Sequence, residues 1–205
     1  MPSQIQVSDV KALDGTAGIS IADSTGRVTV TETNPTITLG SNATGFTGPK
    51  VADVWRLNTE FQGVANPITN LTRATNTNDG SIGSAMTVSS GVFTFPMTGI
   101  YQISFRSLHK IGEANVNVTY AGTCINKVIS GSVTSLVQSY FGRATTGSSA
   151  MFYYINYCNI IFDCTNITTD KVSFATNDLS PTSVYTMAST ASNTTAMFFT
   201  RIGDT

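Results

Sequence analysis

The sequence predicts an all-β protein, and three observations support that prediction. Only 11% of the 205 residues are charged, and the polar remainder is largely Thr, Ser, Asn and Gly. Threonine favours strands through its branched Cβ, whereas Asn, Ser and Gly favour the turns between strands. Hydrophobic residues make up 40% of the chain and recur with a period of two, and no segment keeps a 3.6-residue period over three turns. We therefore expect strands, turns and almost no helix.

Residues 1–48 form the first expected unit. Short alternating apolar pieces are broken by turn residues such as Asp14 and Gly15, and no aromatic residue precedes Phe46. Ordering a chain costs ~1–2 kcal/mol per residue, and so few apolar side chains cannot offset that cost alone. We expect a β-rich attachment or trimerisation segment that folds against further copies or a larger assembly. Residues 41–49 are typical of a linker.

Residues 49–205 form the second expected unit, in which aromatic residues become frequent. Residues 91–110 predict a hairpin-like pair of strands with a turn from Pro96 to Gly99, and residues 114–120 predict a further half-buried strand. Loops are expected at Asn66-Pro67 and at residues 76–80. Alternation places the following side chains on buried strand faces: Val51, Trp55, Leu57 and Phe61; Phe93 and Phe95; and Tyr101, Ile103 and Phe105.

Two segments, residues 151–164 and 195–202, are apolar on both faces of the expected strand. One face can join the core of the domain, but the other needs a partner, since exposed apolar strips are rare on monomers. We therefore expect a subunit interface here, and the alternative is a central strand covered by a long loop. The candidate interface residues are Tyr153, Tyr157, Met197 and Phe199.

The segment from Gly91 to Phe105 contains the pattern Gly-x-Phe-x-x-Pro-x-x-Gly-x-Tyr, and its positions are Gly91, Phe93, Pro96, Gly99 and Tyr101, followed by Phe105. This pattern resembles the central motif of the globular heads of the complement/tumour-necrosis-factor superfamily. Residues 169–172 and 195–204 resemble later elements of the same heads. The resemblance covers residues 50–205 and implies a ten-stranded jelly-roll β-sandwich that forms trimers. Residues 125–148 have no counterpart in it.

Residues 11–30 and 35–48 resemble the amino-terminal regions of bacteriophage structural proteins, in which a short β segment attaches a jelly-roll knob to the particle. This resemblance implies a homotrimeric virion component that binds other virion proteins through residues 1–48. A tail fibre or spike and a capsid decoration protein both fit. The knob would then adhere to a host-surface glycan or protein, or stabilise the particle.

Charge and hydropathy argue against other partner classes. The formal net charge is −1 and no basic run occurs, so we expect no nucleic-acid binding. No stretch approaches the ~18 apolar residues of a membrane span, so we expect no membrane insertion. The first ten residues have neither a cationic start nor an apolar core, so no secretory signal is expected. These features fit synthesis in the host cytoplasm and release with a virus particle.

The sequence offers little catalytic chemistry. His109 is the only histidine, and we expect it at a loop edge rather than in a catalytic site. The twelve acidic residues are scattered, whereas glycoside cleavage needs two opposed carboxylates. A polysaccharide-degrading tail-spike enzyme on a β scaffold is the alternative from another class, and a secreted carbohydrate-binding module is a third possibility.

We expect no metal or cofactor either. The three cysteines, Cys124, Cys158 and Cys164, form no Cys-x-x-Cys pair, and they are interpreted as buried thiols, with their pairing left open. Residues 76–80 lack the alternate ligands and closing Glu of a calcium loop and predict a plain turn. Trp55 could stack on a sugar, but its strand-face neighbours favour a core position.

Overall fold

The computed structural model describes residues 49–75, 79–111, 117–145, 151–177 and 184–205. The chain divides into two units between Gly45 and Phe46. The first unit lies outside the described residues, and the β-rich attachment segment expected over residues 1–48 therefore stays a prediction. All that follows concerns the second unit.

The described residues form strands and loops and contain no helix. The twelve strands are β1 (Ala52–Leu57), β2 (Phe61–Gln62), β3 (Leu71–Arg73), β4 (Thr87–Ser89), β5 (Val92–Thr94), β6 (Gly99–Ile111), β7 (Asn117–Ile129), β8 (Ser132–Thr145), β9 (Phe152–Cys164), β10 (Lys171–Asn177), β11 (Val184–Thr186) and β12 (Ala196–Gly203). The expected all-β class is confirmed.

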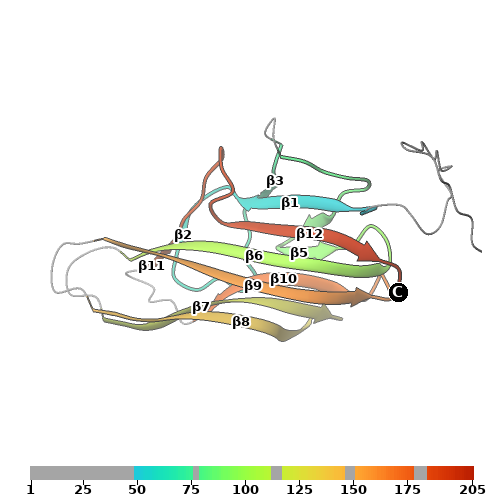
Figure 1. The fold of residues 1–205 in the computed structure, drawn as a ribbon. Helices are drawn as coiled ribbons and strands as arrows, with labels where there is room; N and C mark the ends of the chain where they lie inside the picture. Colours follow the sequence, from blue (N-terminus) through green and yellow to red (C-terminus); the bar gives the residue numbers. More distant parts are fainter. Residues whose placement is uncertain (1–48, 76–78, 112–116, 146–150, 178–183) are drawn as a thin grey trace, which may run out of the picture. The chain divides into compact units, whose positions relative to one another are not determined.

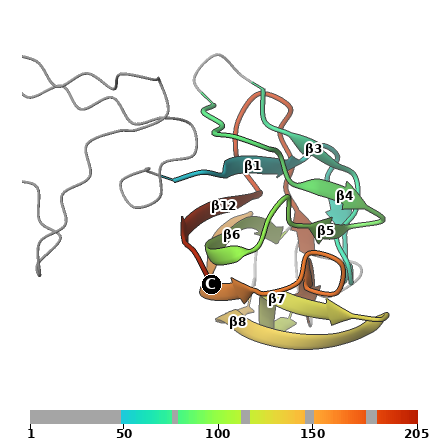
Figure 2. The ribbon, with the colours of Figure 1, turned by 90° about the vertical axis from the view of Figure 1, so that its right-hand side faces the viewer.

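The strands form two antiparallel sheets, which appear as separate layers in Figures 1 and 2. The seven-stranded sheet has the order β2-β11-β6-β12-β1-β3, and β9 pairs with β6 along its other side. The five-stranded sheet has the order β4-β5-β10-β7-β8. Consecutive strands repeatedly change sheet, as from β5 to β6 and from β9 to β10. A sandwich with such crossovers is a jelly roll.

Aromatic side chains from both sheets fill the space between the layers. Phe93 of β5 packs edge-on against Phe174 of β10 at a ring-centroid distance of 5.5 Å, and lies 5.0 Å from Phe199 of β12. Phe95 stacks on Phe162 of β9 at 5.3 Å. Such pairs stabilise beyond their buried area by about 0.5–1.5 kcal/mol each. The alternating faces expected for residues 51–61 and 91–105 all contribute to this core.

The hairpin-like pair expected over residues 91–110 is wrong in its pairing. β5 pairs with β4 and β10 in one sheet, whereas β6 pairs with β9, β11 and β12 in the other. The turn at Pro96 therefore carries the chain from one layer to the other. Phe95 and Tyr101 meet across this turn at 4.6 Å, which is a contact between layers rather than along one hairpin.

The glycine and tyrosine positions of the motif have identifiable structural roles in two turns, the β4–β5 turn and the turn between the layers. Ser90 and Gly91 have positive φ values of 49° and 79°, as a two-residue type I′ hairpin turn requires. A Cβ on Gly91 would lie 2.4 Å from the backbone oxygen of Ile68. Gly99 has φ 145°, and a Cβ there would lie 2.2 Å from Nε of Arg201. Tyr101 donates its hydroxyl to the carbonyl oxygen of Met97 at 2.8 Å and closes the turn.

β7 and β8 are the long hairpin in the stretch without a counterpart in the resemblance. Ser130 and Gly131 form a second turn with two positive φ values, 48° and 82°. The register shifts between Ile125 and Asn126. A bulge of this kind interrupts the period-two pattern.

Candidate functional surface

The outer face of the seven-stranded sheet, which is turned away from the five-stranded sheet, exposes an apolar strip. Along β9 the side chains alternate, so that Cys158 and Phe162 are buried while their neighbours are exposed. We call the large side chains of this exposed set the β9 strip, and its members are Tyr153, Ile155, Tyr157 and Ile161. The polar residues Asn159 and Asp163 lie on the same face. Tyr153 is 58% exposed, Tyr157 54% and Ile161 59%. Four large apolar side chains on one strand face are unusual for a surface that stays in water.

Neighbouring strands extend this surface. In the register of β6 with β9, Leu108 lies opposite Ile155 and Arg106 lies opposite Tyr157, so these side chains share the outer face. Phe198 of β12 lies on the same face and is half-buried, and Ile202 is exposed. The outer face is therefore a largely apolar surface that carries two cations among the described residues, Arg106 opposite Tyr157 and Lys110 opposite Tyr153.

The prediction of interface residues is wrong for two of the four. Met197 is 0% exposed and Phe199 is 1% exposed, because they pair with Phe105 and Ile103 of β6 and point into the core of the subunit. The residue between them, Phe198, occupies the outer face instead. Tyr153 and Tyr157 lie on the exposed face of β9, and their role in an interface stays a prediction.

β9 also lies at the edge of its sheet, with β6 as its only pairing partner among the described strands. Its buried side chains attach this edge to the second layer. Asn156 donates from Nδ2 to the carbonyl oxygen of Ala121 at 3.3 Å, and the thiol of Cys158 donates to the carbonyl oxygen of Thr123 at 3.3 Å. A long edge strand with an apolar outer face is open to association with another chain.

His109 was expected at a loop edge, and that expectation is wrong. It lies inside β6 with no exposed surface. Its Nε2 is 3.0 Å from Oγ of Ser107 and its Nδ1 is 3.3 Å from Oγ1 of Thr186. Burial lowers the pKa of His109 to about 4, so the ring is neutral at pH 7. Ser107 is equally buried, and this serine–histidine pair therefore cannot reach a substrate in this fold.

The three cysteines are buried and free, as expected for small apolar side chains. Burial raises the pKa of Cys124 and of Cys158, and it raises the pKa of Cys164 to about 11. All three are therefore thiols at neutral pH, and a protonated thiol is a poor nucleophile. They pack in the sandwich and bring no reactive group to its surface.

Trp55 occupies the core position that its neighbours predict. Its ring packs edge-on against Phe93 at 5.5 Å, and its Nε1 donates to Oδ2 of Asp53 at 3.0 Å. Asp53 is a buried carboxylate, and no pattern in the sequence predicted it. It also accepts from Nε of Arg73 at 2.6 Å and from the backbone N–H of Met86 at 2.9 Å. The hydrogen bonds of the Asp53 carboxylate, which we call the Asp53 hub, join β1, β3 and the segment before β4.

No candidate metal centre appears within the described ranges, where no group of three or more His, Cys, Asp or Glu side chains comes together. Asp79, from the loop that superficially resembles a calcium site, lies 3.6 Å from Nη2 of Arg56 and accepts from Asn193 at 3.0 Å. Residues 76–78 of that loop lie outside the described residues. The described ranges also hold no helix that could cross a membrane.

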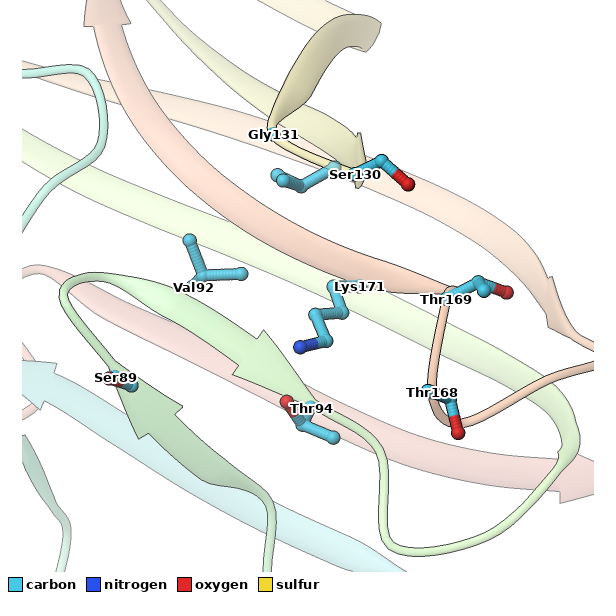
Figure 3. Close-up of a pocket in the computed structure, with 9 residues that line it drawn as sticks. Ser89, Val92, Thr94, Ser130, Gly131, Thr168, Thr169 and Lys171 are labelled. Atoms are coloured by element: carbon cyan, nitrogen blue, oxygen red, sulfur yellow. The ribbon is translucent and has the colours of Figure 1, made fainter.

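A hollow of about 470 Å³ lies on the five-stranded sheet, and no sequence pattern predicted it. Three separate parts of the chain line it: the β4–β5 hairpin, the β7–β8 turn, and the end of the loop before β10 together with the first residue of β10. Figure 3 shows hydroxyl groups on several sides of Lys171. The lining residues are Ser89, Val92, Thr94, Val128, Ser130, Gly131, Thr168, Thr169 and Lys171.

Comparison with known proteins identifies the fold. No protein-family model and no curated protein matches the sequence. The solved structure of the Eiger TNF from S. frugiperda matches with a TM-score of 0.57 at 9% identity, covering 77% of this chain and 95% of that chain. Murine APRIL at pH 5.0 matches with a TM-score of 0.52 at 12% identity, covering 74% of this chain and 98% of its own. At these identities the likeness shows the fold alone: residues 49–205 contain a tumour-necrosis-factor-like jelly roll, as the resemblance of residues 91–105 implied.

Proposed function

We propose that this chain is a non-enzymatic surface protein of a bacteriophage particle, assembled as a homotrimer through the outer face of its seven-stranded sheet. The single observation that supports the assembly best is the β9 strip. Tyrosine and isoleucine side chains in this number are rarely left in water, and tyrosine is enriched where subunits meet. The β9 strip takes no part in the core between the two sheets, so within the described residues it is available to a second copy.

The position of the strip also favours contact between copies. It lies on an edge strand, and Phe198 and Ile202 continue it onto β12. A cyclic assembly would cover these side chains in every subunit without leaving an apolar face exposed. Arg106, opposite Tyr157, would then lie at the rim or within the contact, where arginine stacks well on aromatic rings.

Attachment is assigned to residues 1–48 by their resemblance to the amino-terminal regions of phage structural proteins. In this proposal they bind other virion proteins, while residues 49–205 form the knob. Three knobs on one attachment point act together, so weak single contacts with a host-surface glycan or protein add up to strong adhesion. The protein would be made in the host cytoplasm and leave with the particle.

Substitution within the strip tests the assembly. Tyr157→Asp replaces a large aromatic side chain in the proposed contact with a carboxylate, and even beside Arg106 the desolvation penalty of a buried ion pair can exceed its Coulombic gain. We expect light scattering to show a trimer for the unaltered chain and a monomer for this variant. Val64→Asp is the matched control, because Val64 is 56% exposed in the loop after β2, and it should remain trimeric. If Tyr157→Asp stays trimeric, the β9 strip is not the interface.

Imaging tests the location. An antibody against residues 49–205 should label intact particles of the virus that encodes the chain. Label gathered at one vertex would indicate a tail fibre or spike, whereas label over the whole shell would indicate a decoration protein. Purified particles that carry no label would contradict the virion role in either form.

A further inference from the structure

We propose that the hollow around Lys171 is a binding site for a carboxylated sugar, such as a hexuronic acid. The hollow lies on the opposite sheet from the β9 strip, and all its lining residues belong to one subunit. The binding of the sugar does not depend on the proposed adhesion role. Only its biological purpose rests on that role, in which the sugar would be the host-surface ligand of the knob.

The charge of the hollow comes from one ammonium group. Lys171 stands at the start of β10, opposite Thr94 of β5 and Val128 of β7. No acidic side chain lines the hollow. The preceding residue, Asp170, points elsewhere: its carboxylate lies 3.2 Å from Nζ of Lys127 and accepts from the backbone N–H groups of Thr165 and Asn166. Burial alone would raise the pKa of Asp170, but these hydrogen bonds and Lys127 lower it, so Asp170 stays engaged as an anion. Within the described part of the chain, Lys171 has no ion-pair partner of its own.

Hydroxyl side chains line the hollow around Lys171: in Figure 3, Ser89 and Thr94 lie on the side toward which its ammonium points, and the others lie on other sides. None of them makes a side-chain hydrogen bond with another described residue, so each can donate to and accept from a ligand. They are Ser89, Thr94, Ser130, Thr168 and Thr169. A sugar ring displays hydroxyls that also donate and accept, and this lining is complementary to several of them at once.

Two apolar side chains complete the match. Val92 and Val128 line the hollow beside Lys171 and offer methyl groups to the C–H face of a ring. The volume of about 470 Å³ falls in the range of small-molecule sites, about 300–1,000 Å³. A single lysine carries one compact positive charge, which balances the one negative charge of a hexuronate carboxylate but only part of the charge of a phosphate dianion.

The turn chemistry of the chain keeps this lining in place. The Ser90-Gly91 and Ser130-Gly131 turns both need positive φ values, and each sets one wall of the hollow. Residues 87–94 and 128–132 are thereby fixed by hairpin geometry rather than by long mobile loops. A site built on strands and tight turns holds its groups more precisely than one built on loops.

A matched pair of probes tests the proposal with the full-length protein. Methyl β-D-glucuronide and methyl β-D-glucoside differ only in a carboxylate in place of a hydroxymethyl group. Ligand-observed NMR titration should show millimolar binding of the glucuronide and at least about tenfold weaker binding of the glucoside, as expected when a charge-assisted hydrogen bond is absent. Inorganic phosphate should compete poorly.

Variants assign the effect to the hollow. Lys171→Gln should weaken glucuronide binding at least about tenfold, down to the level of the glucoside, and Lys171→Arg should retain the preference for the glucuronide. Thr94→Val should weaken both probes. Lys50→Gln removes an exposed lysine outside the hollow and should leave binding unchanged.

Several results would overturn the carboxylated-sugar site: no binding of the glucuronide at tens of millimolar, equal binding of both sugars, phosphate competing as well as the glucuronide, or Lys171→Gln binding like the unaltered chain. Light scattering on the same samples keeps the two proposals separate. A trimer without sugar binding contradicts only this inference, whereas a monomer that binds the glucuronide contradicts only the assembly.

Discussion

Asp53 illustrates how a single buried charge organises one end of the seven-stranded sheet. Its two carboxylate oxygens accept hydrogen bonds from Trp55, Arg73, Met86 and the backbone of Val54. The partner guanidinium of Arg73 is partly exposed, so part of its attraction is screened by water. The carboxylate itself is only 1% exposed, and it holds three segments of the chain together.

Asp53→Asn should therefore destabilise the fold strongly. The amide retains one acceptor oxygen but directs an NH₂ group toward donors, which leaves buried polar groups unpaired. We expect the free energy of unfolding to fall by about 2–4 kcal/mol. Urea denaturation at fixed protein concentration measures this change, and Glu60→Gln, at an exposed site, should stay within about 0.5 kcal/mol. A loss of less than about 1 kcal/mol for Asp53→Asn would show that the hub is dispensable.

His109 makes stability depend on pH in a defined window. Its pKa is about 4 in the fold because of burial, and about 6.5 in the unfolded chain. Below pH 6.5 the unfolded chain binds a proton that the fold excludes, so the stability present above pH 6.5 is lost as pH falls toward 4. The expected slope from this residue approaches about 1.4 kcal/mol per pH unit.

His109→Gln isolates this contribution. Glutamine can still bond with Ser107 and Thr186 but does not titrate, so its unfolding free energy should fall less steeply than that of the unaltered chain between pH 6.5 and 4.5. Denaturant titrations across that range provide the comparison. Parallel pH profiles for the two proteins would show that His109 is not the titrating group.

The position of His109 could not be predicted from the sequence, and the reason is physical. Lys110 beside it and the polar residues nearby are typical of a strand end, but the strand continues to Ile111, and β9 and β11 pair with it there. Whether a polar residue is buried depends on these cross-strand neighbours. Alternation along one strand contains no information about them.

The same limit explains the error at Met197 and Phe199. Residues 195–202 are apolar on both faces, so the alternation separates Met197 and Phe199 from Phe198 but does not say which set points inward. The register with β6, in which Met197 lies opposite Phe105 and Phe199 opposite Ile103, decides it. In β9 the polar residues Asn156, Asn159 and Asp163 fall on both faces of the strand, so the alternation there does not say which face points inward either.

At the scale of elements, strand faces were predictable and strand partners were not. The buried faces of residues 51–61 and 91–105 are as expected, because a period of two needs no partner to be recognised. The supposed hairpin failed because its two strands belong to different sheets. β8 was missed because the register shift between Ile125 and Asn126 and a run of Ser and Thr hide its alternation.

The β4–β5 hairpin provides a prediction at this scale. Gly91 combines a φ of 79° with a backbone oxygen 2.4 Å from where a Cβ would stand. Gly91→Ala adds left-handed strain, about 1–2 kcal/mol, to a clash with backbone that cannot easily move. We expect at least about 2 kcal/mol of destabilisation in urea denaturation.

Gly80→Ala is the control for that variant. A Cβ on Gly80 would meet nothing within 4 Å, so its effect should stay within about 0.5 kcal/mol. Equal effects at the two glycines would contradict the role assigned to the turn. A large effect at Gly91 alone would show that the glycine of the motif is needed for the β4–β5 turn.

At the scale of the whole molecule, the jelly roll follows from the sequence, whereas the hollow around Lys171 does not. The residues of the motif from Gly91 to Phe105 lie close together in the sequence, so the motif can be recognised without the structure. The hollow needs residues from Ser89 to Lys171, brought together by pairing of β5, β7 and β10. A site assembled across three strands and two turns leaves no periodic trace along the chain.

The central claim is that an apolar outer face holds three copies together, and the solution mass tests it most directly. Light scattering should be measured on the full chain and on a chain that begins at residue 49. Assembly through the outer face predicts roughly 65 kDa for the full chain, three times its mass of 21.7 kDa, and a trimer for the shorter chain as well. A trimer only with residues 1–48 present would transfer assembly to that segment, and a stable monomer in both cases would contradict the account.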